Sequence, residues 1–169
     1  MWNDTDTPLA YLITFRCYGT WLHGDERGSV DRRNNLYGAP RIPGHKARHE
    51  ASIGNLKHPP VNLNAAMRNS VEKAIRETCK IRGWELFALN VRTNHAHSVV
   101  KAIAAKSSAV LQALKANSTR QMREDGVWVH EHSPWVDRGS KRMLWSARSV
   151  GAAIEYVLYE QGDALPDFD

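Results

Sequence analysis

The sequence contains no apolar run near the roughly 18 residues that a membrane-spanning helix needs. Residues 1–6 are polar and acidic, unlike a secretory signal. Only two cysteines occur, Cys17 and Cys79, and neither belongs to a Cys-x-x-Cys pair, which excludes zinc ribbons and thioredoxin-like motifs. We therefore expect a cytoplasmic protein without a membrane partner, in which both cysteines act as small buried apolar residues.

No large excess of one charge sign is present either. The chain has 23 Lys and Arg against 18 Asp and Glu, a net charge of +5. This excess permits a polyanionic partner without requiring one, and an ordinary mildly basic enzyme accounts for it equally. The 42% hydrophobic and 24% charged residues over 169 positions are typical of one globular domain.

The spacing of apolar residues predicts four strands and three helices. The strands are expected at 9–18, 84–91, 95–101 and about 142–146, and the helices at 64–82, 107–124 and 149–161. This order predicts an α+β fold of the ferredoxin-like (split βαβ) type. Such a fold is an antiparallel sheet with helices on one face, and here a further C-terminal helix is added.

The helix predicted at 64–82 has the clearest signals at its ends. Asn64 can cap its start and Gly83 can end it. Its basic residues, Arg68 among them, are expected mostly on the outer faces. The inward stripe consists of Met67, Val71, Ala74, Ile75, Thr78 and Cys79.

The stretch at about 24–63 is rich in glycine, proline and basic residues, and it is expected to be a long irregular insertion in a single domain spanning 1–169. A loop of this length in a compact domain is usually functional or lacks fixed structure. Its basic residues can contact phosphates or simply be solvated, and the sequence leaves both alternatives open. They are Arg27, Arg32, Arg33, Arg41, Lys46, Arg48 and Lys57.

Two histidines stand at alternate positions at the start of the strand predicted at 95–101. Because alternate side chains of a strand share a face, His95 and His97 point the same way and Ala96 points into the packing layer. Two adjacent imidazoles are a natural pair of ligands for a divalent metal ion. His130-Glu131-His132 has the same spacing, but its charged middle residue and the proline that follows disfavour a central strand. We therefore favour the first pair.

The helix predicted at 149–161 carries two tyrosines. At 100° per residue, Tyr156 lies on the flank of the apolar stripe and Tyr159 lies almost opposite it. A residue on the flank can reach a metal on the sheet while the helix stays docked, which favours Tyr156 as a reactive group. The alternative is that both are ordinary tyrosines of an amphipathic helix.

Together these features resemble a known family. Asn94-His95-Ala96-His97 after an apolar strand is similar to the HUH motif, and Tyr156-Val-Leu-Tyr-Glu-Gln161 is similar to the tyrosine helix that accompanies it. The run Tyr11–Asp25 also looks like the opening strand of one branch of this family. Over about residues 10–162 the chain resembles the single-tyrosine HUH transposases of bacterial insertion sequences, including the REP-associated tyrosine transposases. The resemblance implies a bacterial, nucleoid-associated DNA transposase that cuts and rejoins single-stranded or hairpin DNA.

The resemblance also implies roles for the residues. A divalent ion, Mg²⁺ or Mn²⁺, held by His95 and His97 would polarise the scissile phosphate. Tyr156 would be the nucleophile, forming a 5′-phosphotyrosine link and freeing a 3′-OH. In the family a glutamine one turn after the tyrosine commonly completes the metal site. Glu160 lies four residues after Tyr156, a spacing that keeps two helical side chains on one face. Gln161 lies five after it but fits the residue type and the inward stripe, so we choose Gln161 and keep Glu160 as the alternative.

Contacts with DNA phosphates are expected from basic residues outside the long loop: Arg16, Arg92, Lys115, Arg120, Arg138, Lys141 and Arg142. Trp21, Trp135 and Trp145 are candidates for stacking on unpaired bases or for the core. Many relatives are dimers in which the tyrosine helix can serve the partner's metal site, so a homodimer is an open alternative. Two other functions also stay open. One is a hairpin DNA-binding protein without transposition, and the other is a metal-dependent nuclease that uses water.

Overall fold

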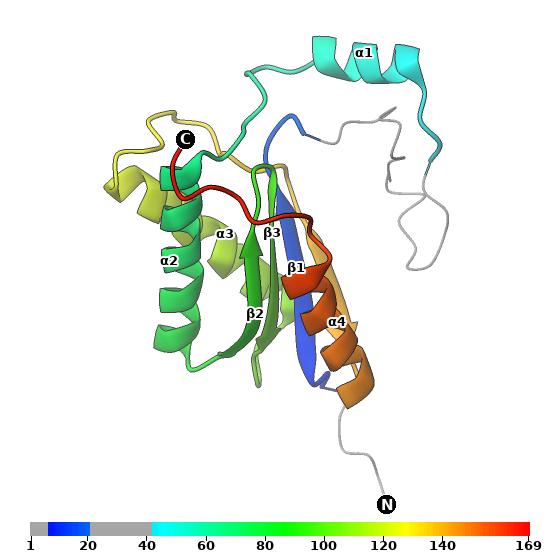
Figure 1. The fold of residues 1–169 in the computed structure, drawn as a ribbon, viewed down its shortest axis with the longest axis vertical. Helices are drawn as coiled ribbons and strands as arrows, with labels where there is room; N and C mark the ends of the chain where they lie inside the picture. Colours follow the sequence, from blue (N-terminus) through cyan, green and yellow to red (C-terminus); the bar gives the residue numbers. More distant parts are fainter. Residues whose placement is uncertain (1–6, 21–41) are drawn as a thin grey trace, which may run out of the picture. The chain divides into compact units, whose positions relative to one another are not determined.

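The computed structural model describes residues 7–20 and 42–169. It divides the chain into two compact units, Met1–Cys17 with Asn62–Asp169, and Tyr18–Val61. The first unit holds the sheet and three of the helices (Figure 1). Within the described ranges, no helix is long and apolar enough to cross a membrane. A single domain over 1–169 stays a prediction.

One antiparallel sheet forms the centre of the first unit. Its strands are β1 (Ala10–Arg16), β2 (Glu85–Val91), β3 (His95–Lys101) and β4 (Ser140–Leu144). They lie in the order β2-β3-β1-β4, and all neighbours are antiparallel. The predicted α+β, ferredoxin-like fold class is thereby confirmed. The last strand begins two residues before the expected position near 142–146.

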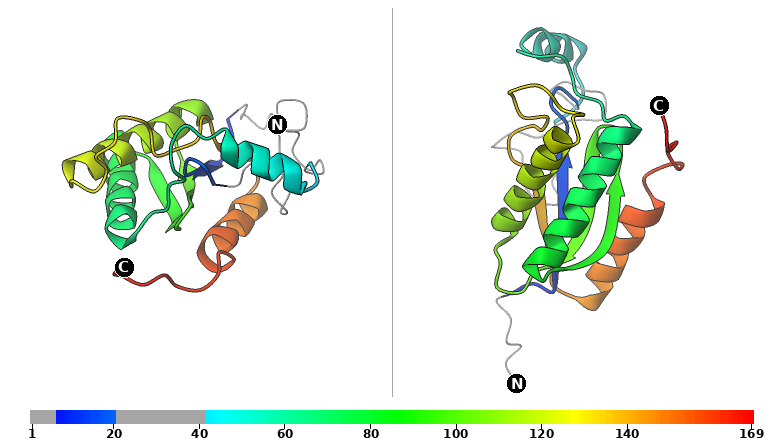
Figure 2. Two further views of the ribbon diagram at one scale, coloured as in Figure 1. Left: turned by 90° about the horizontal axis from the view of Figure 1, so that it is seen from above. Right: turned by 90° about the vertical axis from the view of Figure 1, so that its left-hand side faces the viewer.

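Helices cover both faces of this sheet. The helices α2 (Ala65–Arg82) and α3 (Ser107–Glu124) lie on one face, and α4 (Ala147–Tyr159) lies on the other (Figure 2). The predicted signals of α2 are confirmed, because the Asn64 side chain accepts a hydrogen bond from the Met67 N–H at 2.9 Å and Gly83 ends the helix at φ 69°. A left-handed φ of this kind favours glycine.

The buried side of α2 contains one residue that we expected on an outer face of the helix. Arg68 is only 7% exposed, although we expected the basic residues of this helix on its outer faces. It is covered by the segment that follows α4, and its guanidinium donates to the Pro166 carbonyl, 98 residues further along the chain. A helical wheel cannot predict this burial, because the covering segment is so distant in sequence.

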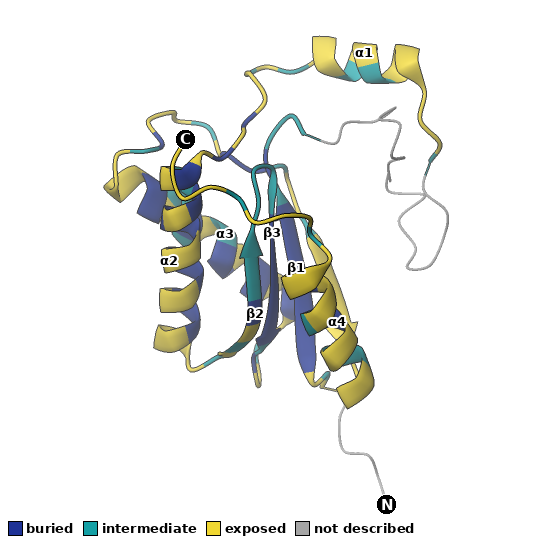
Figure 3. Cartoon of the chain, viewed as in Figure 1, coloured by how far each residue is buried: buried dark blue, intermediate teal, exposed yellow. Residues whose placement is uncertain are grey.

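Apolar side chains dock α4 on the sheet. Val157 is fully buried and Ala153 nearly so. They pack in one cluster with residues of all four strands: Ala10, Leu12, Ala88, Val99 and Leu144. The Asn90 amide also donates to the Val157 carbonyl at 2.9 Å. Figure 3 shows how fully β1 and β3 are enclosed between the two helix layers.

The opposite face of the sheet carries a different core. Phe15 meets Trp135 edge to face, with ring centroids 4.7 Å apart, and Trp135 is 3% exposed. Its indole N–H donates to Thr119 Oγ1 at 3.0 Å. The alternative that Trp135 stacks on bases is therefore wrong, because the ring is buried. Trp145 is 55% exposed and its stacking role stays a prediction, while Trp21 lies outside the described residues.

The second unit contains a helix that the sequence analysis missed. Within the stretch 24–63, which we expected to be irregular, Lys46–Gly54 forms α1. The His45 side chain accepts a hydrogen bond from the Arg48 N–H, and no proline or glycine interrupts the helix before its last residue. None of its residues is buried. Four of the basic residues for which phosphate contact and solvation were both left open lie outside the described residues: Arg27, Arg32, Arg33 and Arg41.

The docking of α4 generates a stability prediction. We expect Val157→Ala to lower the free energy of unfolding by about 2 kcal/mol, because it removes buried methyl groups and leaves a cavity. The neighbouring Leu158 is 42% exposed, so Leu158→Ala is the matched control and should cost less than about 0.5 kcal/mol. Urea unfolding followed by circular dichroism measures both. Equal losses in the two variants would contradict the docking.

Candidate metal and tyrosine site

His95 and His97 lie at the end of the sheet where β1 finishes and β3 begins. In the β1–β3 ladder His97 stands opposite Thr14, and His95 stands opposite Arg16. The two imidazole rings share a face, as predicted, with centroids 4.5 Å apart. This is the face on which α4 lies, because Val99, two residues further along β3, packs in the α4 cluster.

Each imidazole is held through its Nδ1 atom. His97 Nδ1 lies 2.6 Å from Thr14 Oγ1, and His95 Nδ1 lies 2.6 Å from Asn94 Oδ1. In the tautomer with the proton on Nδ1, His95 donates to the Asn94 amide oxygen, and its Nε2 has the lone pair that a metal ion needs. Protein oxygens that fix imidazoles in this way are the usual outer partners of metal-binding histidines. Neither Thr14 nor Asn94 was predicted as a site residue. Thr14 could not be, because the strand register that pairs it with His97 is not readable from the sequence. Asn94 directly precedes His95, and this adjacency is the signal that could have identified it.

Gln161 is the third side chain at this end of the sheet. Its Oε1 lies 3.3 Å from His95 Nε2, and its amide group donates to the Tyr156 carbonyl at 3.0 Å. Neighbouring ligands of an octahedral ion bound at about 2.1 Å lie roughly 3 Å apart, so this donor pair has a suitable separation. Two imidazoles with one amide oxygen therefore fit a divalent ion.

The five-residue spacing between Tyr156 and Gln161 has a local cause. Helix α4 ends at Tyr159, and Glu160 is its C-cap at φ −111° and ψ 22°. One residue outside the helix thus separates Gln161 from the last turn and lets its side chain reach His95. Glu160 is exposed. Of the two alternatives for a third ligand, Gln161 is the one whose side chain contacts the histidine pair.

The charge state of His97 follows from its surroundings. The imidazole is 3% exposed, and burial lowers its pKa to about 3, with further lowering from His95 and Arg16. A hydrogen bond to the Gln161 side chain acts in the opposite direction and raises this pKa. At neutral pH the ring is therefore uncharged, which is the form that can donate a lone pair to a metal ion.

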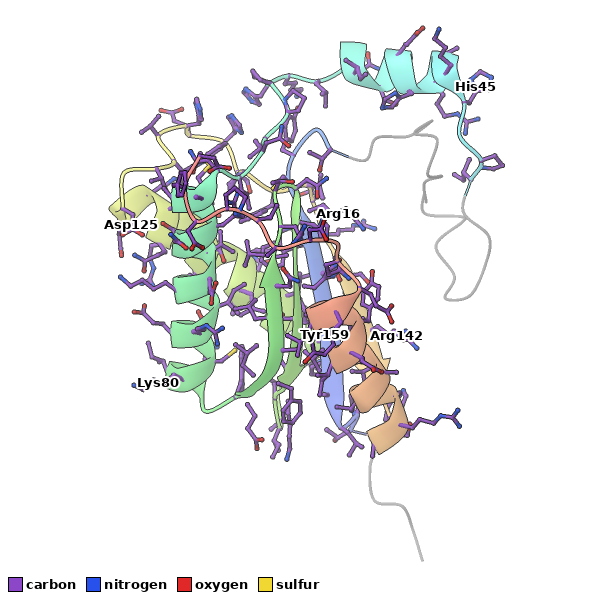
Figure 4. The ribbon with its side chains drawn as sticks, in the orientation of Figure 1. Arg16, His45, Lys80, Asp125, Arg142 and Tyr159 are labelled. Carbon is purple, nitrogen blue, oxygen red and sulfur yellow. The ribbon has the colours of Figure 1, made fainter. Side chains whose placement is uncertain are left out.

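Tyr156 lies beside the histidines. Its ring centroid is 5.4 Å from that of His97, and the side chain is 39% exposed. Tyr159, labelled in Figure 4, is 76% exposed. Of the two tyrosines of α4, Tyr156 is the one that combines contact with the histidine pair and access from solvent.

The second His-x-His sequence lies on a loop after α3. The Arg123 guanidinium donates to the carbonyls of His130 and Glu131 at 3.2 and 2.9 Å, and the rings of His130 and His132 stack with centroids 5.3 Å apart. Neither histidine belongs to a strand. In the described part of the chain, no group of three or more His, Cys, Asp or Glu side chains is arranged to hold a metal ion. The His95–His97 pair lies on a strand and has the Gln161 amide oxygen beside it, so it is the better candidate for a metal site.

Two of the predicted DNA contacts share the face of the histidine pair. Arg16 stands opposite His95 at the end of β1 (Figure 4). Arg142 stands opposite Leu12 on β4, and Leu12 packs against α4. Arg138 and Lys141 are exposed, in the turn before β4 and on that strand. Their contacts with DNA stay predictions.

Three other predicted contacts are engaged within the protein. The Arg92 guanidinium donates to the Asp163 carbonyl at 2.9 Å. Lys115 donates to the Val136 and Arg138 carbonyls at 2.7 Å each, and partial burial lowers its pKa. Arg120 lies 4.0 Å from Glu124 on α3, which covers the opposite face of the sheet. Their DNA roles also stay predictions.

Comparisons with known proteins concern the family and the fold. The family model described as "Transposase IS200 like" matches residues 57–153, more than half of the chain. That range contains both histidines and ends before Tyr156. A search of curated proteins finds no match.

Two solved structures resemble the chain. One is a REP-associated tyrosine transposase bound to a REP hairpin, at a TM-score of 0.50 and 11% identity, with 93% of this chain and 69% of that chain covered. The other is a candidate transposase from Deinococcus radiodurans R1, at a TM-score of 0.45 and 15% identity, with 97% and 98% covered. At these identities the first likeness supports the fold. Together with the family match over residues 57–153, this means that the chain belongs to the IS200-like transposase family.

Proposed function

We propose that this protein cuts and rejoins single-stranded DNA with Tyr156 as the nucleophile, next to a metal ion held by His95, His97 and Gln161. One observation carries the proposal. In a member of the IS200-like transposase family, the Tyr156 ring lies 5.4 Å from the His97 ring, and Gln161 lies 3.3 Å from His95. Family membership alone does not select the tyrosine, because the matched range ends at residue 153.

The proposed step is a transesterification. The Tyr156 oxygen attacks the phosphorus of the scissile phosphate and forms a new P–O bond, while the bond from phosphorus to the 3′ oxygen breaks. The phenol loses its proton and the departing 3′ oxygen gains one, so the charge balances. One DNA end remains attached to Tyr156 through its 5′ phosphate, and the other ends in a 3′-OH. Attack by a 3′-OH on the phosphotyrosine reverses the step and rejoins DNA without an external energy source.

The metal ion has a defined place in this proposal. His95 Nε2, the His97 imidazole and the Gln161 amide oxygen would hold Mg²⁺ or Mn²⁺, and Thr14 and Asn94 would keep the two rings in position. When bound, such an ion polarises the scissile phosphate and stabilises the charge that develops on it.

The substrate proposal rests on charge and access. Arg16 and Arg142 lie on the face of the sheet that carries the histidines, where guanidinium groups can bind phosphate oxygens. A flexible single strand can present its phosphate in line with the Tyr156 oxygen more easily than a duplex. The structurally similar REP-associated transposase was solved with a REP hairpin, and we propose hairpin DNA with a single-stranded flank for this chain.

Docking of α4 on its own sheet supports attack by Tyr156 at the histidine pair of the same chain. In that arrangement one subunit contains a complete set of candidate groups. A homodimer stays a prediction.

The first prediction concerns the nucleophile. Tyr156→Phe removes the oxygen that we propose attacks the phosphorus, so we expect the yield of protein–DNA adduct to fall at least about 1,000-fold. Tyr159→Phe, which removes a hydroxyl from the same helix, should leave the yield within about twofold. A denaturing gel after incubation with a labelled hairpin oligonucleotide and Mn²⁺ measures the adduct.

The same gel distinguishes the proposed function from the two alternative functions, a nuclease that uses water and a DNA-binding protein without cleavage. Cleavage to a free 5′ phosphate with no adduct would favour a nuclease that uses water. Hairpin binding without cleavage by the unsubstituted protein would favour a DNA-binding role. Undiminished adduct in Tyr156→Phe would show that the nucleophile is another residue.

The second prediction concerns the metal ligands. His97→Ala should lower Mn²⁺ affinity more than about 100-fold, and His132→Ala, from the other His-x-His sequence, should not change it. Thr14→Val removes the oxygen on His97 Nδ1 and should cost about tenfold, whereas Thr14→Ser keeps a hydroxyl and most of the affinity. Isothermal titration with MnCl₂ measures all four variants. Loss of binding in His132→Ala with retention in His97→Ala would reverse the assignment.

A further inference from the structure

The segment Gly162–Asp169 runs from the end of α4 to the start of α2, past the end of the sheet that carries the histidine pair (Figures 1 and 2). Two arginines hold it, Arg92 near its start and Arg68 near its end. We infer that these two arginines are positioning residues that act through this segment to keep Gln161 against His95. The inference rests on the proposed function, since it takes Gln161 as a metal ligand.

Arg92 connects the start of the segment to the histidine strand. It lies in the turn between β2 and β3, and its backbone N–H donates to the His95 carbonyl at 2.8 Å. Its guanidinium donates to the Asp163 carbonyl at 2.9 Å, two residues after Gln161. One residue thus bonds both to His95 and to the chain that follows Gln161.

Gly162 forms the turn between these contacts. Its φ is +85°, a conformation that other residues rarely adopt, and a Cβ atom there would lie 3.6 Å from the Arg92 guanidinium, in ordinary van der Waals contact. The backbone after Gln161 therefore lies beside the Arg92 side chain.

Arg68 anchors the far end. It donates to the Pro166 carbonyl at 2.7 Å, to Asp169 Oδ2 at 3.3 Å and to the Leu63 carbonyl at 2.9 Å. The other carboxylate oxygen of Asp169 accepts from the Ala65 N–H in the first turn of α2. Hydrogen bonds from Ala65 and Arg68 hold the pKa of the Asp169 carboxyl below its usual value. A cation that is nearly fully buried is stable only with such partners, so Arg68 favours the docked segment strongly.

Gln161 needs an external anchor because of where α4 ends. It lies two residues beyond Tyr159, the last helical residue, so the helix does not fix its backbone. Its own side-chain bond to the Tyr156 carbonyl is exposed. Ligands on such irregular backbone depend on their surroundings for position, and loss of outer-shell support typically lowers metal affinity 10- to 100-fold.

The test measures Mn²⁺ affinity in the full chain by isothermal titration. Arg92→Ala and Asp169→Ala should each weaken binding about 5- to 10-fold. Arg76→Ala, on the exposed side of α2, and Asp167→Ala, within the same segment, are the matched controls and should leave the affinity within twofold. Asp169→Ala is preferred to a change at Arg68, because loss of the buried arginine endangers folding.

A double-mutant cycle then asks whether the effect passes through Gln161. Once Gln161→Ala has removed the amide, adding Arg92→Ala or Asp169→Ala should not weaken Mn²⁺ binding further. Additive losses in the double variants would overturn the inference. So would unchanged affinity in both single variants with only a lower melting temperature, since that indicates a purely structural anchor.

Failure of this inference is distinguishable from failure of the proposed function. The titration uses no DNA, whereas the proposed function is decided by the covalent adduct on Tyr156. An unsubstituted protein that forms the adduct but shows additive losses in the cycle would overturn the positioning role alone. An unsubstituted protein that binds no Mn²⁺ would overturn both the proposed metal site and the positioning role.

Discussion

The packing of α4 against the sheet is the contact on which the candidate site depends. The site draws its groups from two sources, the histidines from β3 and the Tyr156 and Gln161 side chains from α4 and the residues just after it. Val157 is fully buried one position after Tyr156, so the same helical turn both docks the helix and carries the tyrosine. The packing of Val157 and Ala153 on the sheet therefore determines how Tyr156 approaches His97.

The sheet imposes a second constraint, because its pairing register decides what lies beside each histidine. In the antiparallel pairing of β1 and β3, Thr14 stands opposite His97 and Arg16 stands opposite His95. The Thr14 hydroxyl orients the His97 imidazole, and burial of this ring, with smaller contributions from His95 and Arg16, lowers its pKa and keeps it uncharged. A slip of one residue would turn the histidines to the opposite face of the sheet, against α2 and α3.

Much of this arrangement could be predicted from periodicity. The alternation of His95, Ala96 and His97 predicted a shared face, which the structure confirms. The helical wheel of 149–161 placed Tyr156 nearer the docked side than Tyr159, in agreement with their exposed fractions of 39% and 76%. Cap signals at Asn64 and Gly83 located α2 to within a residue. These features are local, since a few neighbouring residues determine each of them.

The features that the sequence could not reveal are those that join distant segments. The burial of Arg68 depends on Pro166, and the role of Thr14 depends on a strand pairing across 83 residues. Lys115 and Arg92 were predicted to contact phosphates because they are basic, yet both donate to backbone carbonyls. Composition does not tell a cation that binds DNA from one that holds a loop, because both need an acceptor oxygen.

The assignment of Tyr156 as the nucleophile is tested most directly by locating the covalent bond between protein and DNA. Tryptic peptides are analysed after reaction of the protein with a hairpin oligonucleotide in Mn²⁺. Because Tyr156 and Tyr159 lie in one tryptic peptide, fragmentation of that peptide by tandem mass spectrometry identifies the residue that carries the 5′ phosphate. We expect the modified peptide to carry a nucleotide on Tyr156. A nucleotide on Tyr159 or on any other residue, with Tyr156 unmodified, would contradict it.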